Sequence, residues 1–475
     1  MSVQNTLQRA FGLSDFRPGQ REAIEAVLAG KDVFCLFPTG SGKSLTFQLP
    51  AVHANSGFGI VIEPIIALME DQLKFLKSID VSAALLNSSV SESNRMTILA
   101  SLSSPSNPPP FKLLYLTPEQ LTIPTVRAAL ATAKSHVLYL AVDEAHCISD
   151  WGHDFRPAYA QIGSIRTVLA GIPIIACTAT ATTNVVSDIF RQLKLKNPLR
   201  LASSFDRPNL IYTVLFKSSE SDEALQIAGL IKSRWKSACG IIYCWKRQDC
   251  DRLADSLRQH SIRAAPFHAD LANATKSSNQ TAWMSGEVQV LCATVAFGMG
   301  INKPNVRFVI HTTIPKNLAG YYQESGRAGR DGKQAHCVLF YSEEDRRILE
   351  ALQDTEKKKQ GILKVANYCL TGECRRVQLL RFFGEEYSRP SDQKVCCDFC
   401  AAPDVVRRRN LEFRENLGKK GGFNDDTDND VGGGGFKYEF DSRSKTCEDF
   451  ACDAELSRSG KPEDDEGLKT KKGSA

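Results

Sequence analysis

The sequence predicts an α/β protein built from two lobes, each containing a parallel sheet. Short apolar runs alternate with amphipathic helical segments along most of the chain, and these runs form two sets that meet near residues 201–208. Buried strands spaced by helices are typical of parallel sheets. Hydrophobic residues make up 42% of the 475 residues and charged residues 24%, so ordinary globular cores can form.

The expected strands follow from these apolar runs in chain order. The first set comprises Val33–Phe37, Gly59–Ile62, Leu113–Leu116, Val137–Val142 and Ile174–Ala176. The second set comprises Gly240–Cys244, Val288–Cys292, Phe308–His311 and Ala335–Phe340. We therefore expect the first lobe over residues 1–204 and the second over residues 205–345.

Two further parts are expected after the lobes: a small helical module over residues 346–405 and a tail over residues 406–475. The tail contains a glycine run, Gly432–Gly435, and two acidic clusters but few large apolar residues. Such a composition predicts disorder for most of the tail, with only Val405–Leu417 extending a helix.

Composition limits where the protein acts. No apolar run approaches the roughly 20 residues that a membrane helix needs, and the first residues lack the apolar core of a secretory signal. We therefore expect an intracellular protein whose 15 cysteines are thiols or metal ligands. The net charge is +5, and acidic residues outnumber basic ones after residue 403, so the positive excess lies before it and permits a polyanionic partner.

A glycine-rich segment after the first expected strand has the composition of a phosphate-binding loop. Its glycines let the backbone curl around phosphate oxygens, and N–H groups at the start of the next helix point at the anion. The lysine supplies charge for the β- and γ-phosphates of ATP, and the last serine an oxygen for Mg²⁺. The residues are Pro38, Thr39, Gly40, Ser41, Gly42, Lys43 and Ser44. The alternative is a chance glycine-rich turn, because Phe37 stands where the longer form of the pattern has glycine.

An acidic pair follows the apolar run Val137–Val142, within the sequence Asp143-Glu144-Ala145-His146. Ligands bind at the carboxyl ends of strands in parallel sheets. Asp143 is predicted to hold Mg²⁺, and Glu144 to orient and deprotonate the attacking water. The alternative is a loop with two solvated acids.

The eleven residues after this pair, Cys147–Pro157 (CISDWGHDFRP), are rich in aromatic residues. With the two preceding motifs, they make the chain resemble superfamily 2 helicases, and specifically the RecQ family of DNA helicases, over roughly residues 5–405. The resemblance implies two RecA-like lobes, and the short T-G-x-G-K-[ST] loop of the superfamily accommodates Phe37.

The resemblance also assigns contacts with single-stranded DNA to the aromatic-rich loop. Trp151 and Phe155 offer flat faces for bases, Arg156 offers a cation for phosphate, and His153 lies between them. For Tyr159, base stacking and core packing are equally open.

Other motifs of the first lobe follow from the resemblance. Phe16, Arg17 and Gln20 resemble the adenine-recognition motif, in which the glutamine amide reads the base edge. The hydroxyls of Thr178–Thr182 are expected to bond the acidic pair. Glu63 departs from the serine usual in the family and places a negative charge near the expected DNA path.

In the second lobe, Thr294–Pro304 and Tyr321–Gly332 resemble two further helicase motifs. Thr294 and Gly298 are expected at a nucleic-acid phosphate. Arg327 and Arg330 are three residues apart, so on a helix both point one way, toward the γ-phosphate.

Cysteines after the second lobe form a third predicted site. Four thiolates, Cys374, Cys396, Cys397 and Cys400, are able to surround a tetrahedral Zn²⁺. Cys369 is the spare candidate for a zinc ligand. The stretch Val377–Tyr387 is expected to form the helix of this module. The alternative to metal binding is that the cysteines are packed free thiols. Cys239, Cys244 and Cys250 are interpreted as core residues.

Together these features predict an ATP-dependent DNA helicase that moves 3′ to 5′ on single-stranded or forked DNA, acting as a monomer in the nucleus, with the cytoplasm as a second location. Within the family the chain resembles the short animal branch, that of the fifth human paralogue, which lacks winged-helix and terminal helical domains. The alternatives are an RNA helicase, a translocase that clears bound proteins, and an ATP-gated binding or strand-annealing protein with little unwinding.

Overall fold

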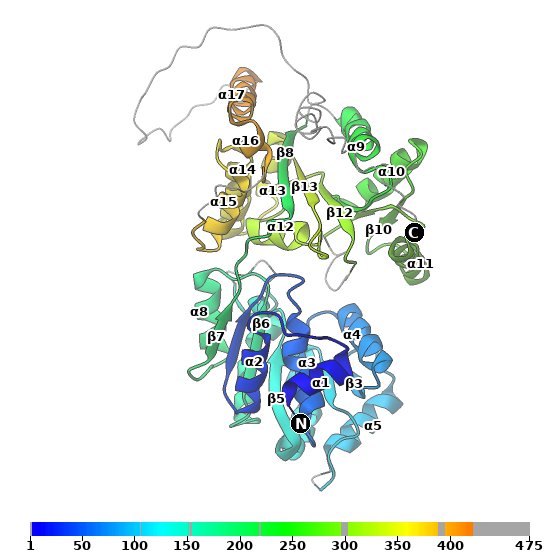
Figure 1. The fold of residues 1–475 in the computed structure, drawn as a ribbon, viewed down its shortest axis with the longest axis vertical. Helices are drawn as coiled ribbons and strands as arrows, with labels where there is room; N and C mark the ends of the chain where they lie inside the picture. The colour runs from blue at the N-terminus through cyan, green and yellow to red at the C-terminus, as the bar shows by residue number, and fades with distance from the viewer. Residues whose placement is uncertain are drawn as a thin grey trace, which may run out of the picture. The chain divides into compact units, whose positions relative to one another are not determined.

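The computed structural model describes residues 2–104, 106–150, 152, 154–217, 220–295, 303–387 and 395–420, without the side chains of 220–222 and 417–420. Two separate parallel sheets lie within one compact unit that ends at Asn416 (Figure 1). The predicted α/β class with two parallel-sheet lobes is confirmed. The predicted disorder of the tail beyond residue 420 lies outside the described residues. None of the helices that the structure describes is long and apolar enough to cross a membrane.

The first lobe contains a seven-stranded parallel sheet in the order β3-β4-β2-β5-β6-β1-β7. Its strands are β1 (Val33–Leu36), β2 (Phe58–Ile62), β3 (Ala83–Leu86), β4 (Leu113–Leu116), β5 (Val137–Val142), β6 (Ile174–Thr178) and β7 (Leu199–Ala202). The central strands are buried on both faces, which explains their continuous apolar sequences.

Helices cover both faces of this sheet. They are α1 (Val3–Phe11), α2 (Gln20–Leu28), α3 (Lys43–His53), α4 (Ile66–Ser78), α5 (Glu92–Leu102), α6 (Pro124–Thr132), α7 (Pro157–Ala160) and α8 (Thr183–Gln192). Short 3₁₀ turns occupy Pro118–Thr122, Ala133–His136, Ala145–Ile148 and Ile162–Thr167. One core cluster joins α2, α3 and α4 to the sheet, and another joins α5, α6 and α8 to it, so the sheet is sandwiched between two helical layers.

The second lobe contains a six-stranded parallel sheet in the order β10-β11-β9-β12-β13-β8. Its strands are β8 (Leu210–Phe216), β9 (Cys239–Tyr243), β10 (Ala264–Phe267), β11 (Val290–Ala293), β12 (Val306–His311) and β13 (Ala335–Tyr341). Its helices are α9 (Glu220–Arg234), α10 (Arg247–Gln259), α11 (Asn273–Ser285), α12 (Leu318–Ser325) and α13 (Glu343–Ala351).

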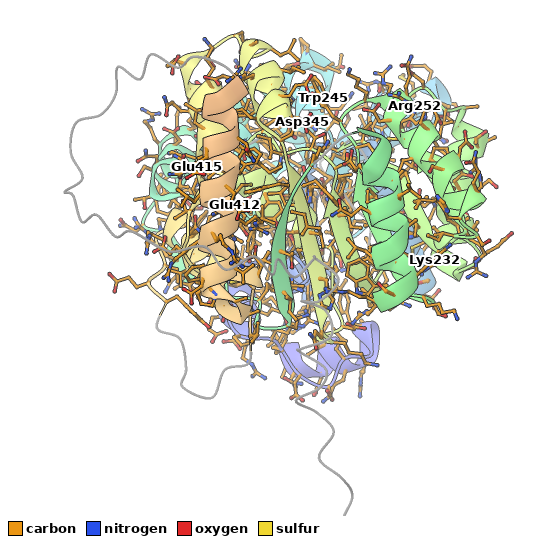
Figure 2. The ribbon with its side chains drawn as sticks, turned by 90° about the horizontal axis from the view of Figure 1, so that it is seen from above. Lys232, Trp245, Arg252, Asp345, Glu412 and Glu415 are labelled. Carbon is orange, nitrogen blue, oxygen red and sulfur yellow. The ribbon has the colours of Figure 1, made fainter. Side chains whose placement is uncertain are left out.

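Helices α9 and α10 pack on one face of this sheet, whereas α11, α12 and the helices after α13 pack on the other. Figure 2 shows this layering from above: Lys232 marks α9 and Arg252 marks α10, while Glu412 and Glu415 mark the last helix, across the strands. Cys244 and Cys250 are buried in the α9–α10 layer, and Cys239 is half-buried against the other layer, as predicted for core residues.

The four strands missing from the prediction are the edge strands of the two sheets: β3, β7, β8 and β10. An edge strand has one neighbour and is partly exposed: β7, β8 and β10 carry Arg200, Thr213 and Pro266 within the strand, whereas β3 is apolar throughout but mostly half-buried. The burial of β7 alternates between half-buried and exposed residues, and that of β8 alternates along its first half. Hydrophobic runs therefore reveal the interior of each sheet but not its borders.

A small helical module follows the second sheet. It consists of α14 (Glu356–Leu370), α15 (Arg375–Phe382), α16 (Asp398–Ala401) and α17 (Pro403–Lys420). The prediction of a helix over Val377–Tyr387 is wrong in its bounds: α15 begins directly after Cys374 and ends before Gly384, whose φ of +79° is incompatible with a helix. Two expected boundaries, after residues 345 and 405, fall within α13 and α17, and they stay predictions.

Candidate functional site

The carboxyl ends of four neighbouring strands, β2, β5, β6 and β1, carry the predicted chemistry of the first lobe. Glu63 follows β2, Asp143 follows β5, Thr178 ends β6, and the phosphate loop follows β1. Because parallel strands present the same end at the same edge, residues more than 100 positions apart in the sequence meet there.

The phosphate loop turns into helix α3 at Gly42. Gly40 and Gly42 have φ values of +87° and +82°, a left-handed conformation that explains the glycines. Lys43 is the first residue of α3, and its Nζ donates to the carbonyl of Phe37 at 3.1 Å. The Ser41 hydroxyl donates to the carbonyl of Pro38 at 2.7 Å. The loop is therefore closed by its own residues, and Thr39 and Ser44 are half-buried beside it.

The predicted adenine-recognition residues lie against this loop. The Gln20 amide nitrogen donates to the carbonyls of Gly42 (2.9 Å) and Ser41 (3.2 Å), and its oxygen accepts from the backbone N–H of Arg17 (2.8 Å). The Arg17 guanidinium donates to the carbonyl of Gly40. Both amide N–H groups of Gln20 are thus used, and its oxygen keeps one acceptor position.

Phe16 is half-buried and packs against a small cluster of apolar residues from α1, α2 and α3. The Arg21 guanidinium lies 5.0 Å from the centroid of the Phe16 ring. The lobe therefore holds the ring by apolar packing and by a cation over one of its faces.

The acidic pair lies at the end of β5. The backbone N–H of Asp143 donates to the carbonyl of Ile62, and one carboxylate oxygen accepts from the N–H of Glu144 at 2.8 Å. Burial and the neighbouring charge of Glu144 together raise the pKa of Asp143 to about 7, against the charge of Lys43, which acts in the opposite direction. Glu144 has a φ of +46°, a left-handed conformation that is rare for a residue other than glycine.

Glu63 corrects the expectation that it places a charge near the DNA path. Its side chain is 1% exposed and hydrogen-bonded to Asp143, inside the lobe. Burial raises the pKa of Glu63 well above its ordinary value, and Asp143 and Glu144 raise it further. The carboxyl of Glu63 is therefore a third acid at the nucleotide end of the sheet.

His146 connects the acidic pair to β6. Its Nδ1 lies 2.8 Å from the Thr178 hydroxyl and 3.3 Å from a carboxylate oxygen of Glu144. The sequence led us to expect that the threonine hydroxyls bond the acidic side chains themselves. The Thr178 hydroxyl bonds His146 and the backbone of Thr180, and the histidine bridges β6 and the acidic pair.

The aromatic-rich loop is only partly described, because Trp151 and His153 lie outside the described residues. Phe155 is 42% exposed, as a residue that stacks on bases must be. The Arg156 guanidinium bonds the Asp154 carboxylate at 3.1 Å and the carbonyl of Pro64 at 2.9 Å. Tyr159 is fully buried and donates to the carbonyl of Asp143 at 2.9 Å, so of its two open interpretations the structure supports core packing.

In the second lobe, Thr294 is half-buried and its N–H donates to the carbonyl of Phe267 at 3.3 Å, whereas Gly298 lies outside the described residues. Arg327 and Arg330 are not on a helix, which corrects the prediction. Helix α12 ends at Ser325, and Gly329 adopts a φ of +58° that a continuing helix would not allow.

We call residues Gly326–Arg330 the arginine loop. Its two arginines still point into one region: Arg327 is buried, and a Cβ added to Gly40 of the phosphate loop would lie 3.6 Å from Cγ of Arg330. Burial and the charges of Arg327 and Arg207 together lower the pKa of Arg330 to about 9. Cations gathered at this density favour an anionic ligand such as a phosphate.

Sequence reasoning missed Arg207 at this site. Its guanidinium contacts the arginine loop and also lies 3.5 Å from the carbonyl of Thr39. Arg207 sits in the segment between the sheets, about 120 residues before the arginine loop. No local pattern in the sequence links positions so far apart.

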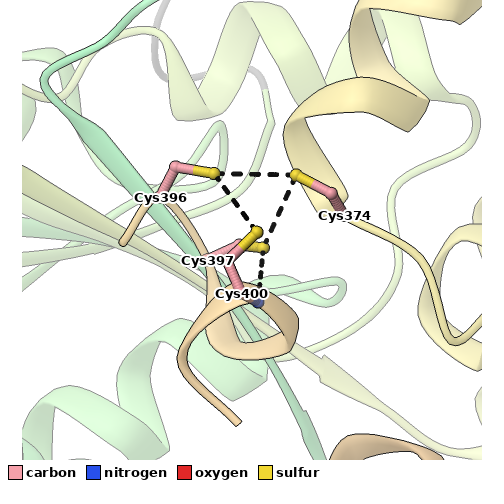
Figure 3. Close-up of side chains that lie close together, drawn as sticks. All are labelled: Cys374, Cys396, Cys397 and Cys400. Atoms are coloured by element: carbon pink, nitrogen blue, oxygen red, sulfur yellow. Dashed lines mark hydrogen bonds between the residues drawn. The ribbon is translucent and has the colours of Figure 1, made fainter. Parts of the chain in front are cut away.

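The four predicted zinc ligands form one cluster (Figure 3). Their sulfur atoms all lie within 4.8 Å of one another. The Sγ–Sγ distances are 3.6 Å for Cys374–Cys396, 3.7 Å for Cys396–Cys400 and 3.9 Å for Cys397–Cys374. The spare candidate, Cys369, is buried in the neighbouring core and is not part of this cluster.

These distances fit a tetrahedral zinc ion. With Zn–S bonds of about 2.3 Å, the edge of such a tetrahedron is about 3.8 Å. The thiols of the cluster differ in acidity. Hydrogen bonds from the neighbouring cysteines lower the pKa of Cys374, whereas burial and the nearby sulfurs raise the pKa of Cys400 to about 12. A dication at the centre would allow all four to ionise.

Comparisons with known families agree with this geometry. Residues 17–189 match the family DEAD/DEAH box helicase, residues 223–332 match Helicase conserved C-terminal domain, and residues 341–401 match RecQ zinc-binding. The chain belongs to the RecQ helicase family. Its curated relatives include RecQ-like DNA helicase BLM from Xenopus laevis, which is 41% identical over 427 residues, 86% of this chain and 31% of that protein.

Two further relatives are similar to the same degree. ATP-dependent DNA helicase Q1 from Rattus norvegicus is 39% identical, over 86% of this chain and 66% of that protein. ATP-dependent DNA helicase Q5 from Rattus norvegicus is 40% identical, over 88% of this chain and 45% of that protein. The chain therefore spans about a third to two thirds of these relatives. Because the identities are so close, the branch within the RecQ family stays a prediction.

Solved structures show the same fold at lower identity. The DUF1998 helicase MrfA bound to DNA and AMPPNP has a TM-score of 0.61 at 14% identity, over 86% of this chain and 55% of that one. The helicase Lhr from Mycobacterium smegmatis, bound to ssDNA and AMP-PNP, has a TM-score of 0.58 at 18% identity, over 86% of this chain and 53% of that one. These likenesses support the fold of the two lobes.

Proposed function

We propose that this protein is an ATP-dependent DNA helicase that moves 3′ to 5′ on single-stranded DNA and separates duplexes ahead of it, in DNA repair, recombination and replication. The observation that carries the proposal is the meeting of Arg330 with Gly40 of the phosphate loop, which brings the arginine loop to the ATP end of the first sheet. Membership in the RecQ family, whose curated members are named as DNA helicases, supports the substrate.

In this proposal ATP binds over the phosphate loop, Pro38–Ser44, with its adenine near Phe16, Arg17 and Gln20. Lys43 neutralises the β- and γ-phosphates, Ser44 and Asp143 hold Mg²⁺, and Glu144 orients the attacking water. Arg327 and Arg330 stabilise charge on the transferring phosphoryl group. The three-acid arrangement of Glu63, Asp143 and Glu144 supports a divalent cation, because carboxylate oxygens are the ligands Mg²⁺ prefers.

Protons should compete with Mg²⁺ for Asp143. Since burial raises the pKa of this carboxyl to about 7, the group is protonated below that pH and loses its ability to bind the cation. We expect the apparent affinity for Mg²⁺ in the presence of nucleotide to fall by up to about tenfold per pH unit below pH 7. Titration of Mg²⁺ against a fluorescent ATP analogue at several pH values measures this slope.

Asp143→Asn is the control for this titration, because the amide does not titrate and its weaker cation binding should depend less on pH than that of the natural protein. An equal slope in both proteins would show that the proton binds the nucleotide or another residue.

Single-stranded DNA is proposed to bind along the aromatic-rich loop and at Thr294. The exposure of Phe155 supports base stacking there. Arg156 reaches a phosphate in this proposal by exchanging its half-buried partner Asp154 for the DNA backbone. Trp151, His153 and Gly298 keep their proposed DNA contacts from the resemblance alone.

Zn²⁺ is proposed to hold the helical module together through Cys374, Cys396, Cys397 and Cys400 in a closed, structural geometry. We further propose that the protein acts on single-stranded and forked DNA as a monomer in the nucleus. The functional units of this proposal are residues 1–204, 205–345, 346–405 and 406–475.

An ATPase titration with three nucleic acids tests the proposal. We expect single-stranded DNA to raise the turnover number by at least about tenfold, with smaller effects from blunt duplex DNA and from RNA of the same sequence, because the strand must lie unpaired across the aromatic-rich loop. ATP hydrolysis at one rate with and without single-stranded DNA would overturn the proposal.

Strand separation on matched forks then decides between the alternatives. An RNA preference would favour an RNA helicase, and DNA-stimulated ATPase without unwinding would favour an ATP-gated binding, strand-annealing or translocating protein. Polarity follows from comparing forks with a 3′ or a 5′ single-stranded tail.

A further inference from the structure

The segment between the two sheets, residues 203–209, holds the arginine loop through two side chains, of which Arg207 makes most of the bonds. The Arg207 guanidinium donates to the carbonyls of Gly326 (3.2 Å), Ala328 (3.0 Å) and Gly329 (3.1 Å). Asn209 adds a bond to the carbonyl of Gly329 at 2.8 Å. We infer that Arg207 is a positioning residue, which sets the conformation of the arginine loop for ATP hydrolysis and is itself held in place by the zinc module; this inference rests on the proposed ATPase function.

The chemistry of a helix end explains why an arginine stands at this position. The last carbonyls of a helix have no intrahelical partner, and a cation there also interacts favourably with the helix dipole. The carbonyls of Gly326, Ala328 and Gly329 lie just beyond the end of α12, and a planar guanidinium reaches all three at once. A lysine amine has the same charge but lacks the several N–H donors that a guanidinium holds in one plane. Arg207 therefore fixes the geometry of the loop as well as its electrostatics.

The position of Arg207 is in turn fixed by Arg376. This residue is buried, and its Nη2 donates to the carbonyls of Arg207 (3.3 Å), Pro208 (3.3 Å) and Leu210 (2.9 Å). Its Nε also pairs with the carboxylate of Asp206 at 3.3 Å. Arg376 therefore grips the backbone of the segment that carries Arg207.

Aromatic packing holds the same segment from the side. The Phe205 ring stacks on Phe383, at the end of α15, with 4.3 Å between centroids and 9° between planes. Tyr322 of α12 meets the Phe205 ring edge-on and donates to the carbonyl of Phe205 at 2.8 Å. The segment is thus wedged between α12, which leads into the arginine loop, and α15 of the zinc module.

The cysteine cluster joins this chain of contacts at the start of α15. Arg376 lies two residues after Cys374, and between them Arg375 is fully buried and bonds Asp398, the residue after Cys397. The first turn of α15 is therefore held by Cys374, which directly precedes it, and by the bond from Arg375 to Asp398. A continuous path of contacts runs from the cysteines through Arg376 and the segment between the sheets to the arginine loop.

The first experiment replaces Arg207 with lysine in the full chain. We expect the turnover number for ATP, measured with saturating single-stranded DNA, to fall by about 10- to 100-fold, because a displaced arginine loop no longer meets the γ-phosphate. The KM for ATP should change by less than about threefold, since most phosphate contacts come from the first lobe. Arg200→Lys, the same chemical change at an exposed position seven residues earlier, should leave both constants unchanged.

A double-mutant cycle separates positioning from other roles. If Arg207 acts through the loop, then Arg207→Lys should have little further effect in a protein that already carries Arg330→Ala, because the group it positions is gone. Effects that simply multiply would overturn the inference, as would a normal turnover number in Arg207→Lys. Absence of ATPase activity in the unsubstituted protein would instead contradict the proposed function, and this result is distinct from a failure of the Arg207 variant alone.

The role of Arg376 has a readout that needs no ATP. In Arg376→Lys, amide hydrogen exchange of residues 203–210 should accelerate by at least about tenfold while the zinc content stays at one equivalent. The turnover number should fall as in Arg207→Lys. Unchanged exchange in a folded, zinc-loaded variant would show that Arg376 does not hold this segment.

Discussion

Replacing Lys43 with alanine is expected to abolish ATP hydrolysis and to leave the protein folded. Lys43 stands at the first turn of α3, where its ammonium group is half-buried and bonds only the carbonyl of Phe37 among the contacts of the described residues. Its contribution to the fold is therefore small. Its charge is needed where negative charge develops on the phosphates, and loss of such a group costs about 100- to 1,000-fold in turnover.

The measurement is single-stranded-DNA-stimulated ATPase activity together with the melting temperature. Lys31→Ala is a matched control, because Lys31 is an exposed lysine at the opposite, amino end of β1. The control should keep its activity. Normal turnover in Lys43→Ala would show that the phosphates of ATP lie elsewhere.

Replacing Cys397 with serine is expected to remove zinc and to destabilise the helical module. The Cys397 side chain is 1% exposed, and its sulfur also accepts from the N–H of Cys400 at 3.4 Å, so it caps α16 as well as facing the other three sulfurs. The segment around it bonds the edge strand β8, through the N–H of Tyr212 to the carbonyl of Cys396 at 3.2 Å. Because metal binding and folding are coupled here, the loss should be at least about 3 kcal/mol of the free energy of unfolding.

Cys369→Ser distinguishes loss of the metal from the cost of a buried hydroxyl. Cys369 is also fully buried, in α14 of the same module, yet it lies outside the sulfur cluster. This control should lose some stability and still bind one equivalent of zinc by atomic absorption. One equivalent of zinc in Cys397→Ser would mean that the ligand set is wrong.

Much of the nucleotide end of the first sheet was predictable because each motif is local. The glycines of Gly40 and Gly42, the charge of Lys43 and the acids after β5 are contiguous with apolar runs that identify their strands. Parallel pairing then brings them together without further information. The cysteine cluster was predictable for the same reason, since the spacing of Cys396, Cys397 and Cys400 is itself a ligand pattern.

Predictions from local sequence patterns were wrong where tertiary packing decides the environment or the conformation of a residue. Glu63 looks like a surface acid in sequence, but β2 lies beside β5, so its carboxyl is buried against Asp143. The arginine loop looks helical, but Gly329 turns the chain and Arg207 holds the result.

The sequence by itself determined the α/β class, the interior strands of the two sheets, the phosphate loop with its acidic partner and the cluster of four cysteines, because apolar runs and short motifs record strand burial and ligand chemistry directly. Only the tertiary structure decided the edge strands, the burial of Glu63 and the part played by Arg207 and Arg376. Those features depend on contacts between residues far apart in the chain, and such contacts leave no periodic or local trace in the order of the amino acids.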